Sequence, residues 1–338
     1  MQSSFFDSAD RLFSQECTPA QIRQIEAGGD TQALWESLVS AGFSDALLPE
    51  SADGAGLTLS EVWPILFCMG RHVLPLPYAQ TMLARAWLQQ QGQALPEGSI
   101  TFAPFQVQAD STGVTARAVT FGLTANWVLA QHDKQIWLLP VGAAKVTPSG
   151  GHGSLDADLQ WPAGVTQSAL LGDWATPQFR ELLALSLAVL IAGAADRIFE
   201  MTLAHANQRV QFGKPIGKFQ AVQQQISEMA ELAFGARMAT EMSCRSASWQ
   251  PAPALAALAK CQSSQSVARM TAYAHAVHGA IGVTHEYDLQ LYTRRLNEWS
   301  RAGGGASYWA SVIGEQALKS GATAVDFVRT DLFAEPAV

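Results

Sequence analysis

The stretch NQRVQFGKPIGKFQ, residues 207–220, decides the fold of this 338-residue chain. A helical pattern ends near Arg209, and the turn formed by residues 212–215 interrupts it because glycine and proline disfavour helix. A second helix then begins, so the stretch predicts a helix hairpin. Free N–H groups at that helix start, beside an arginine, favour an anionic oxygen such as a diphosphate. On spacing alone, a simpler interpretation is that Arg209 pairs with an acid while Phe212 fills the core.

Outward from this hairpin, apolar residues recur at helical spacing almost to the end of the chain. The pattern predicts four long helices, near residues 177–208, 217–247, 252–278 and 284–320, separated by glycine, proline or serine breaks. Four helices of this length can close a bundle. We therefore predict a C-terminal four-helix bundle over residues 173–330.

The residues before the bundle show two different sequence patterns. Residues 96–172 hold short β-rich runs separated by Gly, Asp and Ser, and their even spacing predicts a small antiparallel barrel or sandwich. In this region His152 lies in a glycine-rich loop, and we interpret it as a solvated residue rather than a ligand. Residues 1–95 read as helices, with breaks at 54–57 and 74–77. The predicted class is α+β: a helical N-terminal domain, a small central β domain and the bundle.

Composition limits the possible partners. The net charge is −8 and no basic run offsets it, so we expect no nucleic-acid partner. With 48% hydrophobic and only 15% charged residues, the exterior is apolar enough to predict an oligomer. The N-terminus lacks a basic flank and an apolar run, and the longest apolar segment is short, so we expect a cytoplasmic chain with no membrane association. Four scattered cysteines without a CxxC pair predict neither a disulfide framework nor a metal site.

Two longer motifs carry a resemblance to a known family. Residues 207–220 resemble the R-x-x-F-G-x-x-I-x-x-F-Q signature of the acyl-CoA dehydrogenase family. The string HGAIGVTHE, residues 278–286, resembles the family's H-G-G-I-G-x-T-x-E segment, and residues 54–56 and 74–77 resemble its first-domain loops. The match is colinear over nearly the whole chain, and it includes the helix, β, helix order.

The resemblance implies FAD and a dimer interface. In this family FAD lies between the β domain of one subunit and the bundle of its mate, whose arginine contacts the diphosphate. The implied cofactor-binding residues are Arg209, Phe212, Phe219, Gln220, His278, Gly279 and Ala280. The chain departs from the family at Ala276, where Gln is common, and at Ala280, where Gly is usual. Some contacts to FAD are therefore expected to be weaker.

The resemblance fails at the catalytic base. The family's reaction needs a glutamate beside the α-carbon of a fatty acyl thioester, while hydride leaves the β-carbon for flavin. The usual spacing, counted from Gly279, places this base at Gly303, and the less common position, counted back from Arg209, falls on Leu183. We interpret Glu181 as an ordinary carboxylate of a helix start and Glu298 as a surface residue. No catalytic residue of this chain is assigned.

The β region also lacks the family's Thr-Glu-x-x-x-Gly-Ser-Asp flavin loop. A short member without base and flavin loop resembles the smaller subunit of heteromeric acyl-CoA dehydrogenases, some of which act on CoA thioesters of steroid side chains. The resemblance implies an α2β2 assembly with two FAD, in which a larger acyl-CoA dehydrogenase subunit supplies the glutamate. It also implies an acyl-CoA substrate and an electron-transferring flavoprotein as acceptor.

Two other functions stay open. The chain is alternatively a self-sufficient homodimeric dehydrogenase that uses an unusual base, such as Glu181 or Glu298. It is alternatively a structural or regulatory paralogue that kept the fold and lost both cofactor and chemistry. Retention of Arg209 and the Phe212-Gly213 turn argues mildly against this last alternative.

Overall fold

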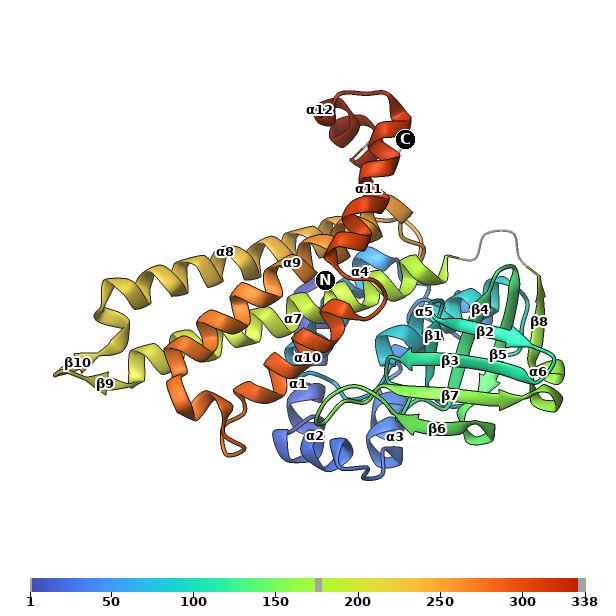
Figure 1. Cartoon of the computed structure of the whole chain (residues 1–338), viewed down its shortest axis with the longest axis horizontal. Helices are drawn as coiled ribbons and strands as arrows, with labels where there is room; N and C mark the ends of the chain where they lie inside the picture. Colours follow the sequence, from blue (N-terminus) through green and yellow to red (C-terminus); the bar gives the residue numbers. More distant parts are fainter. Residues whose placement is uncertain (1, 174–177, 334–338) are drawn as a thin grey trace.

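A computed structural model describes residues 2–173 and 178–333 of the chain. It shows N-terminal helices, then a β-sandwich, then a long helical bundle, so the predicted α+β class is confirmed (Figure 1). The expected start of the first bundle helix, near residue 177, lies outside the described residues.

Five helices form the N-terminal part, and their ends follow local sequence signals. Thr58 caps α4: its hydroxyl accepts the Glu61 backbone N–H, while the Glu61 carboxylate accepts the Thr58 N–H at 2.8 Å. This reciprocal pair is a capping box. Helix α5 begins directly after the proline-rich break at 74–77, as predicted. The helices are α1 (Gln2–Glu16), α2 (Pro19–Glu26), α3 (Gln32–Ser40), α4 (Leu59–Arg71) and α5 (Tyr78–Gln90), with 3₁₀ turns η1 (Phe43–Asp45) and η2 (Glu50–Ala52).

The central region is a sandwich of two four-stranded sheets, ordered β1-β4-β5-β8 and β2-β3-β7-β6. The expectation of a purely antiparallel arrangement is wrong in one place, because β1 and β4 pair in parallel. The chain leaves β1 to build β2 and β3 in the other sheet, so it returns to the first sheet by a crossover. The strands are β1 (Ile100–Ala103), β2 (Val107–Asp110), β3 (Gly113–Val119), β4 (Trp127–His132), β5 (Gln135–Pro140), β6 (Lys145–Pro148), β7 (Ala157–Pro162) and β8 (Leu170–Asp173), with the turn η3 (Val141–Ala143) and helix α6 (Ala163–Ala169).

Alternation along the strands of the first sheet divides the core in two. Ile100 and Phe102 of β1 join the large core of the helices, whereas Val128 and Trp137 join a second core between the two sheets. Successive strand residues point to opposite faces, so both faces of this sheet are covered. The sheet therefore lies between the helices and the second sheet.

The bundle contains five long helices rather than the predicted four. The segment expected as one helix over 284–320 is divided in two, because Gly303 and Gly304 adopt φ values of +63° and +89° that L-residues disfavour. The elements are α7 (Phe179–Gln208), the short hairpin β9 (Val210–Gln211) and β10 (Lys214–Pro215), η4 (Ile216–Lys218), α8 (Gln220–Ser243), α9 (Pro253–His278), η5 (Gly279–Val283), α10 (Leu289–Arg301) and α11 (Ala306–Ser320), followed by α12 (Ala324–Asp326) and the π-helical turn η6 (Phe327–Leu332).

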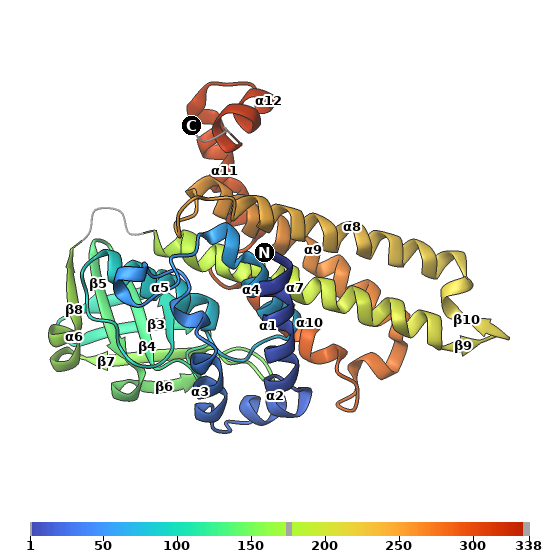
Figure 2. The same ribbon diagram turned by 180° about the vertical axis from the view of Figure 1, so that it is seen from behind.

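Helix α7 joins the N-terminal helices to the bundle. A Cβ added to Gly193 of α7 would lie 2.1 Å from the Phe67 carbonyl oxygen, and one added to Gly70 of α4 would lie 2.3 Å from that of Leu190. Paired glycines thus allow α4 and α7 to cross closely, and Figure 2 shows α1 and α4 covering α7 from behind. Helix α7 is long and apolar enough to cross a membrane, but 83% of its most apolar window is buried inside the protein. This buried, central position explains why α7 is so apolar.

Candidate active-site cavity and cofactor-binding end

A cavity of about 920 Å³ lies between the β-sandwich and the bundle. Its lining comes from the end of β1 and the loop after it, from β3, from the loop before β7, and from α7, α9 and α10. One wall is apolar and contains Phe102, Phe105, Leu183 and Tyr308. The rest of the lining is mostly polar or charged. A large pocket of mixed character at a domain junction is the usual form of a small-molecule site.

Both positions that family spacing gives for a catalytic base lie on the apolar wall. Leu183 of α7 and Gly303, in the turn between α10 and α11, line the cavity, and a Cβ on Gly303 would lie 3.2 Å from the Leu183 side chain. Two positions far apart in the chain therefore meet at one place. Neither residue carries a carboxylate, so this part of the wall cannot remove a proton from a ligand.

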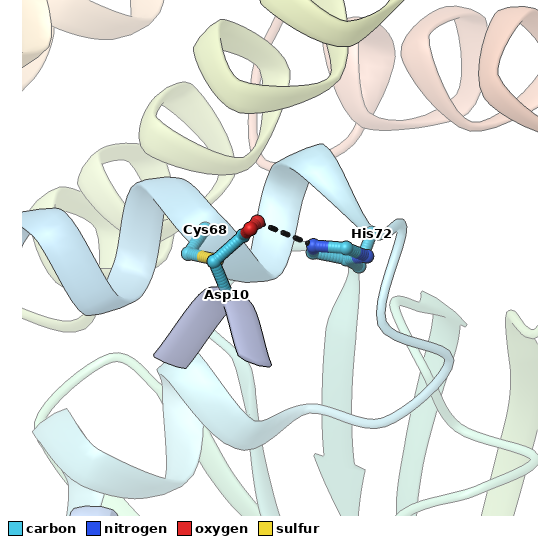
Figure 3. Close-up of side chains that lie close together, drawn as sticks. All are labelled: Asp10, Cys68 and His72. Carbon is cyan, nitrogen blue, oxygen red and sulfur yellow. Dashed lines mark hydrogen bonds and ion pairs between the residues drawn. The ribbon is translucent and has the colours of Figure 1, made fainter. Parts of the chain in front are cut away.

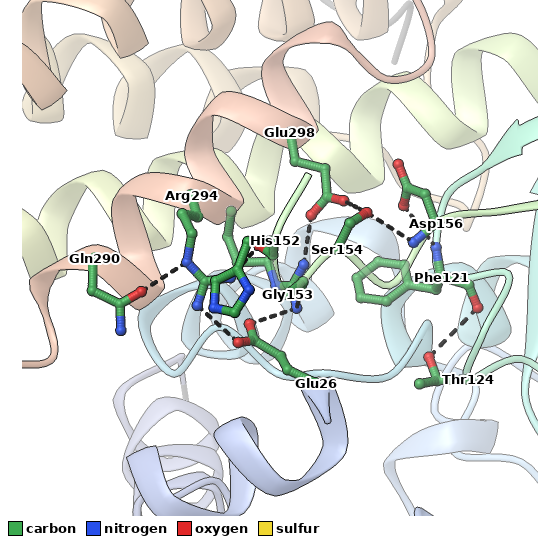
Figure 4. Close-up of polar contacts among 11 residues, drawn as sticks. Glu26, Phe121, Thr124, His152, Gly153, Ser154, Asp156, Gln290, Arg294 and Glu298 are labelled. Carbon is green, nitrogen blue, oxygen red and sulfur yellow. Dashed lines mark hydrogen bonds and ion pairs between the residues drawn. The ribbon is translucent and has the colours of Figure 1, made fainter. Parts of the chain in front are cut away.

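The polar wall is built on two consecutive arginines of α10 (Figure 4). Arg294 and Arg295 each donate to the Glu26 carboxylate at 2.8 Å, which ties the bundle to the end of α2. Both also donate to backbone carbonyls of the loop before β7, at 2.7 Å to His152 and 2.8 Å to Gly153. The side chains of Arg295 and Glu26 are 2% and 6% exposed. A buried, paired network of this kind holds the loop against the cavity.

Two carboxyl groups end this network inside the cavity. Glu298 accepts from Arg295 at 2.5 Å and also from the Ser154 hydroxyl. Asp156 accepts the Phe121 backbone N–H at 3.2 Å, and its own N–H donates to the Ser154 hydroxyl oxygen. Burial, together with the negative charge of Glu298, raises the pKa of Asp156 well above its usual range. The wall thus presents two carboxyl groups in different environments.

Glu298, Glu181 and His152 lie at different places relative to the cavity. The interpretation of Glu298 as a surface residue is wrong: its side chain is 16% exposed and lines the cavity, because Arg295 draws it inward. Glu181 lies outside the cavity lining, and burial raises its pKa. His152 is exposed at the cavity rim.

The first group of predicted cofactor residues lies at the far end of the bundle from the β-sandwich (Figure 1). Arg209 ends α7 and is exposed, and within the described parts of the chain its guanidinium has no hydrogen-bond or ion-pair partner. Phe212 is 91% exposed, and its ring packs edge-on against Phe219 with centroids 6.1 Å apart. Lys214 lies 4.4 Å from the Phe219 ring, and Gln220 begins α8. The simpler interpretation, with Arg209 paired and Phe212 in the core, does not hold.

The second predicted group lies at the end of α9. His278 is buried: one ring nitrogen contacts the Ala274 carbonyl at 2.8 Å, and the other contacts the Tyr287 hydroxyl at 3.2 Å. Its ring stacks on His205, one turn before Arg209, which connects the two groups. Gly279 adopts φ +66° and ψ −148°, with open space around the position of a Cβ. Only glycine takes this conformation readily, so the turn offers bare backbone to a ligand.

The geometry of these two groups suits FAD. Exposed Arg209, with no internal counter-ion among the described residues, can pair with a diphosphate, and the exposed rings beside it can cover an aromatic system. The backbone at Gly279 and the exposed Ala280 can approach the ligand closely. The ring of His278 is committed to internal contacts, so its part in such a site is to fix the turn.

A separate cluster of Asp10, Cys68 and His72 joins α1 to α4 outside the cavity (Figure 3). Their possible ligand atoms lie within 4.8 Å of one another, and spacing of the cysteines alone did not reveal this group. His72 contacts Asp10 at 2.9 Å, and Cys68 donates to the same oxygen at 3.6 Å. Burial raises the pKa of Cys68, which keeps it a thiol rather than the thiolate that metals require. The cluster is accounted for as a hydrogen-bonded contact between two helices.

Comparisons with known proteins show what the sequence and the fold are similar to. Residues 181–318 match the acyl-CoA dehydrogenase C-terminal domain. Over 85% of the chain, the sequence is 28% identical to acyl-CoA dehydrogenase IpdE2 of Mycobacterium tuberculosis, of which 87% is covered. The bundle is therefore similar to the C-terminal domain of acyl-CoA dehydrogenases, and most of the chain is similar in sequence to an acyl-CoA dehydrogenase.

Two solved structures share its fold. A chain of the Tcur3481-Tcur3483 steroid ACAD superposes with a TM-score of 0.82 at 23% identity, covering 95% of this chain and 99% of that one. A chain of the ChsE4-ChsE5 complex from Mycobacterium tuberculosis gives 0.80 at 24% identity, covering 94% and 97%. The second of these is named as a complex, and the first carries the double name Tcur3481-Tcur3483.

Proposed function

We propose that this chain is the non-catalytic subunit of a heteromeric, FAD-dependent acyl-CoA dehydrogenase that removes hydrogen across the α,β bond of an acyl-CoA thioester. One observation carries the proposal. The two places where the family puts its base, Leu183 and Gly303, come together on the cavity wall, and neither holds a carboxylate. The base must then come from a larger partner subunit, in an α2β2 assembly with two FAD.

The role of this chain towards FAD is to complete the cofactor site of its partner. When bound, FAD supplies the hydride acceptor of the reaction. Arg209 would hold the diphosphate, Phe212 and Phe219 would cover the cofactor, and Gln220 and the backbone at Gly279 would approach it. All of these lie at the end of the bundle that is farthest from this chain's own β-sandwich, where a neighbouring subunit can reach them (Figure 1). Phe212 is 91% exposed and its ring packs against that of Phe219, so the two rings form an aromatic surface that a neighbouring subunit could cover.

The names of the relatives guide the choice of substrate and partners. One structure of the same fold is named as the Tcur3481-Tcur3483 steroid ACAD, so a bulky thioester such as a steroid-derived acyl-CoA is our proposed substrate. An electron-transferring flavoprotein is the proposed acceptor of electrons, and the cytoplasm the proposed location. These proposals are independent of the assignment of the base.

Co-expression with a candidate larger subunit tests the proposal. We expect a mixed tetramer with one FAD for every two chains, and dehydrogenation only in the mixture. Arg209→Met should lower flavin occupancy of that tetramer, while Arg11→Met, which changes an exposed arginine of α1, should not. A flavin-loaded and active homodimer of this chain alone would refute the subunit role.

A second function is favoured by the position of Glu298. Because this carboxylate lines the cavity, a self-sufficient homodimer could use it as base, whereas Glu181 lies outside the lining. Pairing with Arg295 and Ser154 holds Glu298 in the wall and opposes that use. The chain alone should be mixed with FAD and acyl-CoA, comparing Glu298→Gln with Glu181→Gln. Flavin reduction that only Glu298→Gln abolishes would establish this second function.

A further inference from the structure

Arg117 of β3 and Arg301 of α10 are two cavity-lining arginines for which the proposed subunit role gives no use. Both are exposed, and within residues 2–173 and 178–333 neither guanidinium has a hydrogen-bond or ion-pair partner. A guanidinium is always charged and presents five N–H donors in a planar fork that matches carboxylate and phosphate oxygens. Two such groups on one cavity lining therefore indicate a ligand that carries negative charge.

The cavity lining has a surplus of positive charge. It contains four arginines and, among the described residues, two acidic side chains, Asp156 and Glu298. Glu298, together with Glu26, matches Arg294 and Arg295 (Figure 4). Asp156 cannot balance both of the remaining arginines, whether or not it holds a proton, so at least one positive charge is left. The whole chain has a net charge of −8, and a cavity of the opposite sign concentrates anions.

A β-bulge in β3 carries Arg117. The register between β3 and β7 shifts by one residue between Ala116 and Val119, which both belong to the core between the sheets. Arg117 and Ala118, inside this shift, are both exposed and both line the cavity. The Asp158 carboxylate accepts the Ala118 backbone N–H at 2.8 Å and supports the bulge. Bulges of this kind often lie next to active sites, where they re-aim a side chain.

One aromatic pair connects the two segments that carry the arginines. The Arg117 backbone N–H donates to the Gln106 carbonyl at 3.2 Å, and Gln106 directly follows Phe105. The ring of Phe105 packs edge-on against Tyr308, with centroids 5.6 Å apart. Tyr308 follows the glycine turn that begins after Arg301, the last residue of α10. The charged groups are thus held on segments that also build the apolar wall.

The complementary ligand has an anionic head group and an apolar body. Guanidinium groups form their strongest hydrogen bonds with carboxylate and phosphate oxygens. Phe102, Phe105 and Leu183 offer apolar contact to the rest of the ligand. The Arg180 guanidinium lies 5.1 Å from the centre of the Phe105 ring and adds positive charge beside that wall. A cationic ligand is disfavoured by this surplus, and an uncharged one would leave it unmatched.

We propose that the cavity of this chain binds an organic anion with an apolar body, and that Arg117 and Arg301 pair with its anionic head group. This subsite is separate from the exposed end at Arg209, and it does not depend on the partner-subunit role. The head group has two possible sources, the carboxylate of a free acid or the phosphates of a CoA thioester. Both present anionic oxygens to the two arginines, and the experiment below separates them.

Equilibrium dialysis of the full chain with 2-naphthoate and with 2-acetylnaphthalene tests the subsite, because the two ligands share a ring system and differ in charge. We expect the wild type to prefer naphthoate near neutral pH. Arg117→Met and Arg301→Met should each lower this preference about three- to tenfold, since each removes one charged donor. Arg301→Lys should keep part of it, because the charge stays. Arg11→Met, at an exposed arginine outside the cavity lining, should leave it unchanged.

A parallel titration with coenzyme A identifies the source of the head group. Loss of the naphthoate preference alone in the Arg117 and Arg301 variants assigns the head group to a carboxylate. Loss of coenzyme A affinity in these variants, but not in Arg11→Met, assigns it to the phosphates. An unchanged naphthoate preference combined with unchanged coenzyme A affinity overturns the proposal. So does an equal loss of affinity for naphthoate and for the ketone, because the arginines would then shape the cavity without recognising charge.

Discussion

Lys260 of α9 gives the sharpest prediction, because it is a fully buried lysine. Its ammonium donates to the carbonyl oxygens of Trp299 and Ser300 at 2.8 and 3.0 Å, and to the Ser264 hydroxyl at 3.1 Å. The two carbonyls belong to the last turn of α10, where the helix dipole is negative. No carboxylate within the described ranges forms an ion pair with Lys260. The side chain therefore holds the helix end that leads into the glycine turn of the cavity.

Burial lowers the pKa of Lys260 from its ordinary value of 10.5 to about 7. Above pH 7 the folded protein releases this proton while the unfolded chain keeps it up to about pH 10.5, so the unfolded state binds more protons. The free energy of unfolding therefore rises with pH in this window, by about 1.4 kcal/mol per pH unit from this group. Between pH 6 and pH 9 the change amounts to about 3 kcal/mol.

The test is urea unfolding of the wild type and Lys260→Met at pH 6, 7, 8 and 9, followed by the fluorescence of the ten tryptophans. The wild type should gain stability over the variant by about 3 kcal/mol across this range. Lys319→Met is the control, because Lys319 is 79% exposed and should show no such trend. A stability difference that stays constant from pH 6 to pH 9 would mean that Lys260 keeps its proton in the core, and would refute the reasoning.

Four further substitutions can be compared by denaturant or thermal unfolding. Arg295→Met removes one of the two guanidinium partners of buried Glu26 and also the ion-pair partner of Glu298, so it should cost roughly 3–5 kcal/mol; a loss below 1 kcal/mol would show that the network is solvated. Gly279→Ala should cost about 1–3 kcal/mol through backbone strain alone, whereas Gly314→Ala, in α11 with equally open space, should stabilise by roughly 0.5–1 kcal/mol. Gly193→Ala should cost about 1–3 kcal/mol or more, seen as a lower melting temperature, because its methyl group forces α4 and α7 apart; an unchanged melting temperature contradicts that close crossing.

The order of helices and strands could be predicted because its signals are local. The break at 74–77 placed the start of α5, and the hairpin at 207–220 placed the join between α7 and α8. The division of the last helix was missed, although the sequence contains its cause in Gly303 and Gly304, because helical periodicity continues on both sides of the turn. The parallel pairing of β1 with β4 was also missed, since strand partners are set by the path between sheets and not by strand composition.

The polar wall of the cavity could not be predicted from local sequence signals. Glu26, Asp156 and Arg295 come from three distant parts of the chain, and nothing in the local pattern of each residue indicates that they meet. The sequence predicted that Glu298 lies on the surface, because charged side chains of an amphipathic helix usually face solvent. Only the packing of α10 against the loop before β7 placed Glu298 in the cavity wall, where it binds Ser154 and Arg295.

By itself, the sequence determined the helix, β, helix order, the presence of motifs that resemble the family's cofactor-binding strings, and the absence of a glutamate at either expected base position, because each depends on residue type and spacing along one chain. The tertiary structure decided that Leu183 and Gly303 lie against each other, that Lys260 binds the end of α10, and that the buried side chain of Asp156 lines a cavity. These facts depend on burial and on charges brought together from distant residues. Desolvation and charge pairing depend on which groups are close in space. The pKa shifts and hydrogen bonds of the cavity wall are therefore set only when the chain is folded.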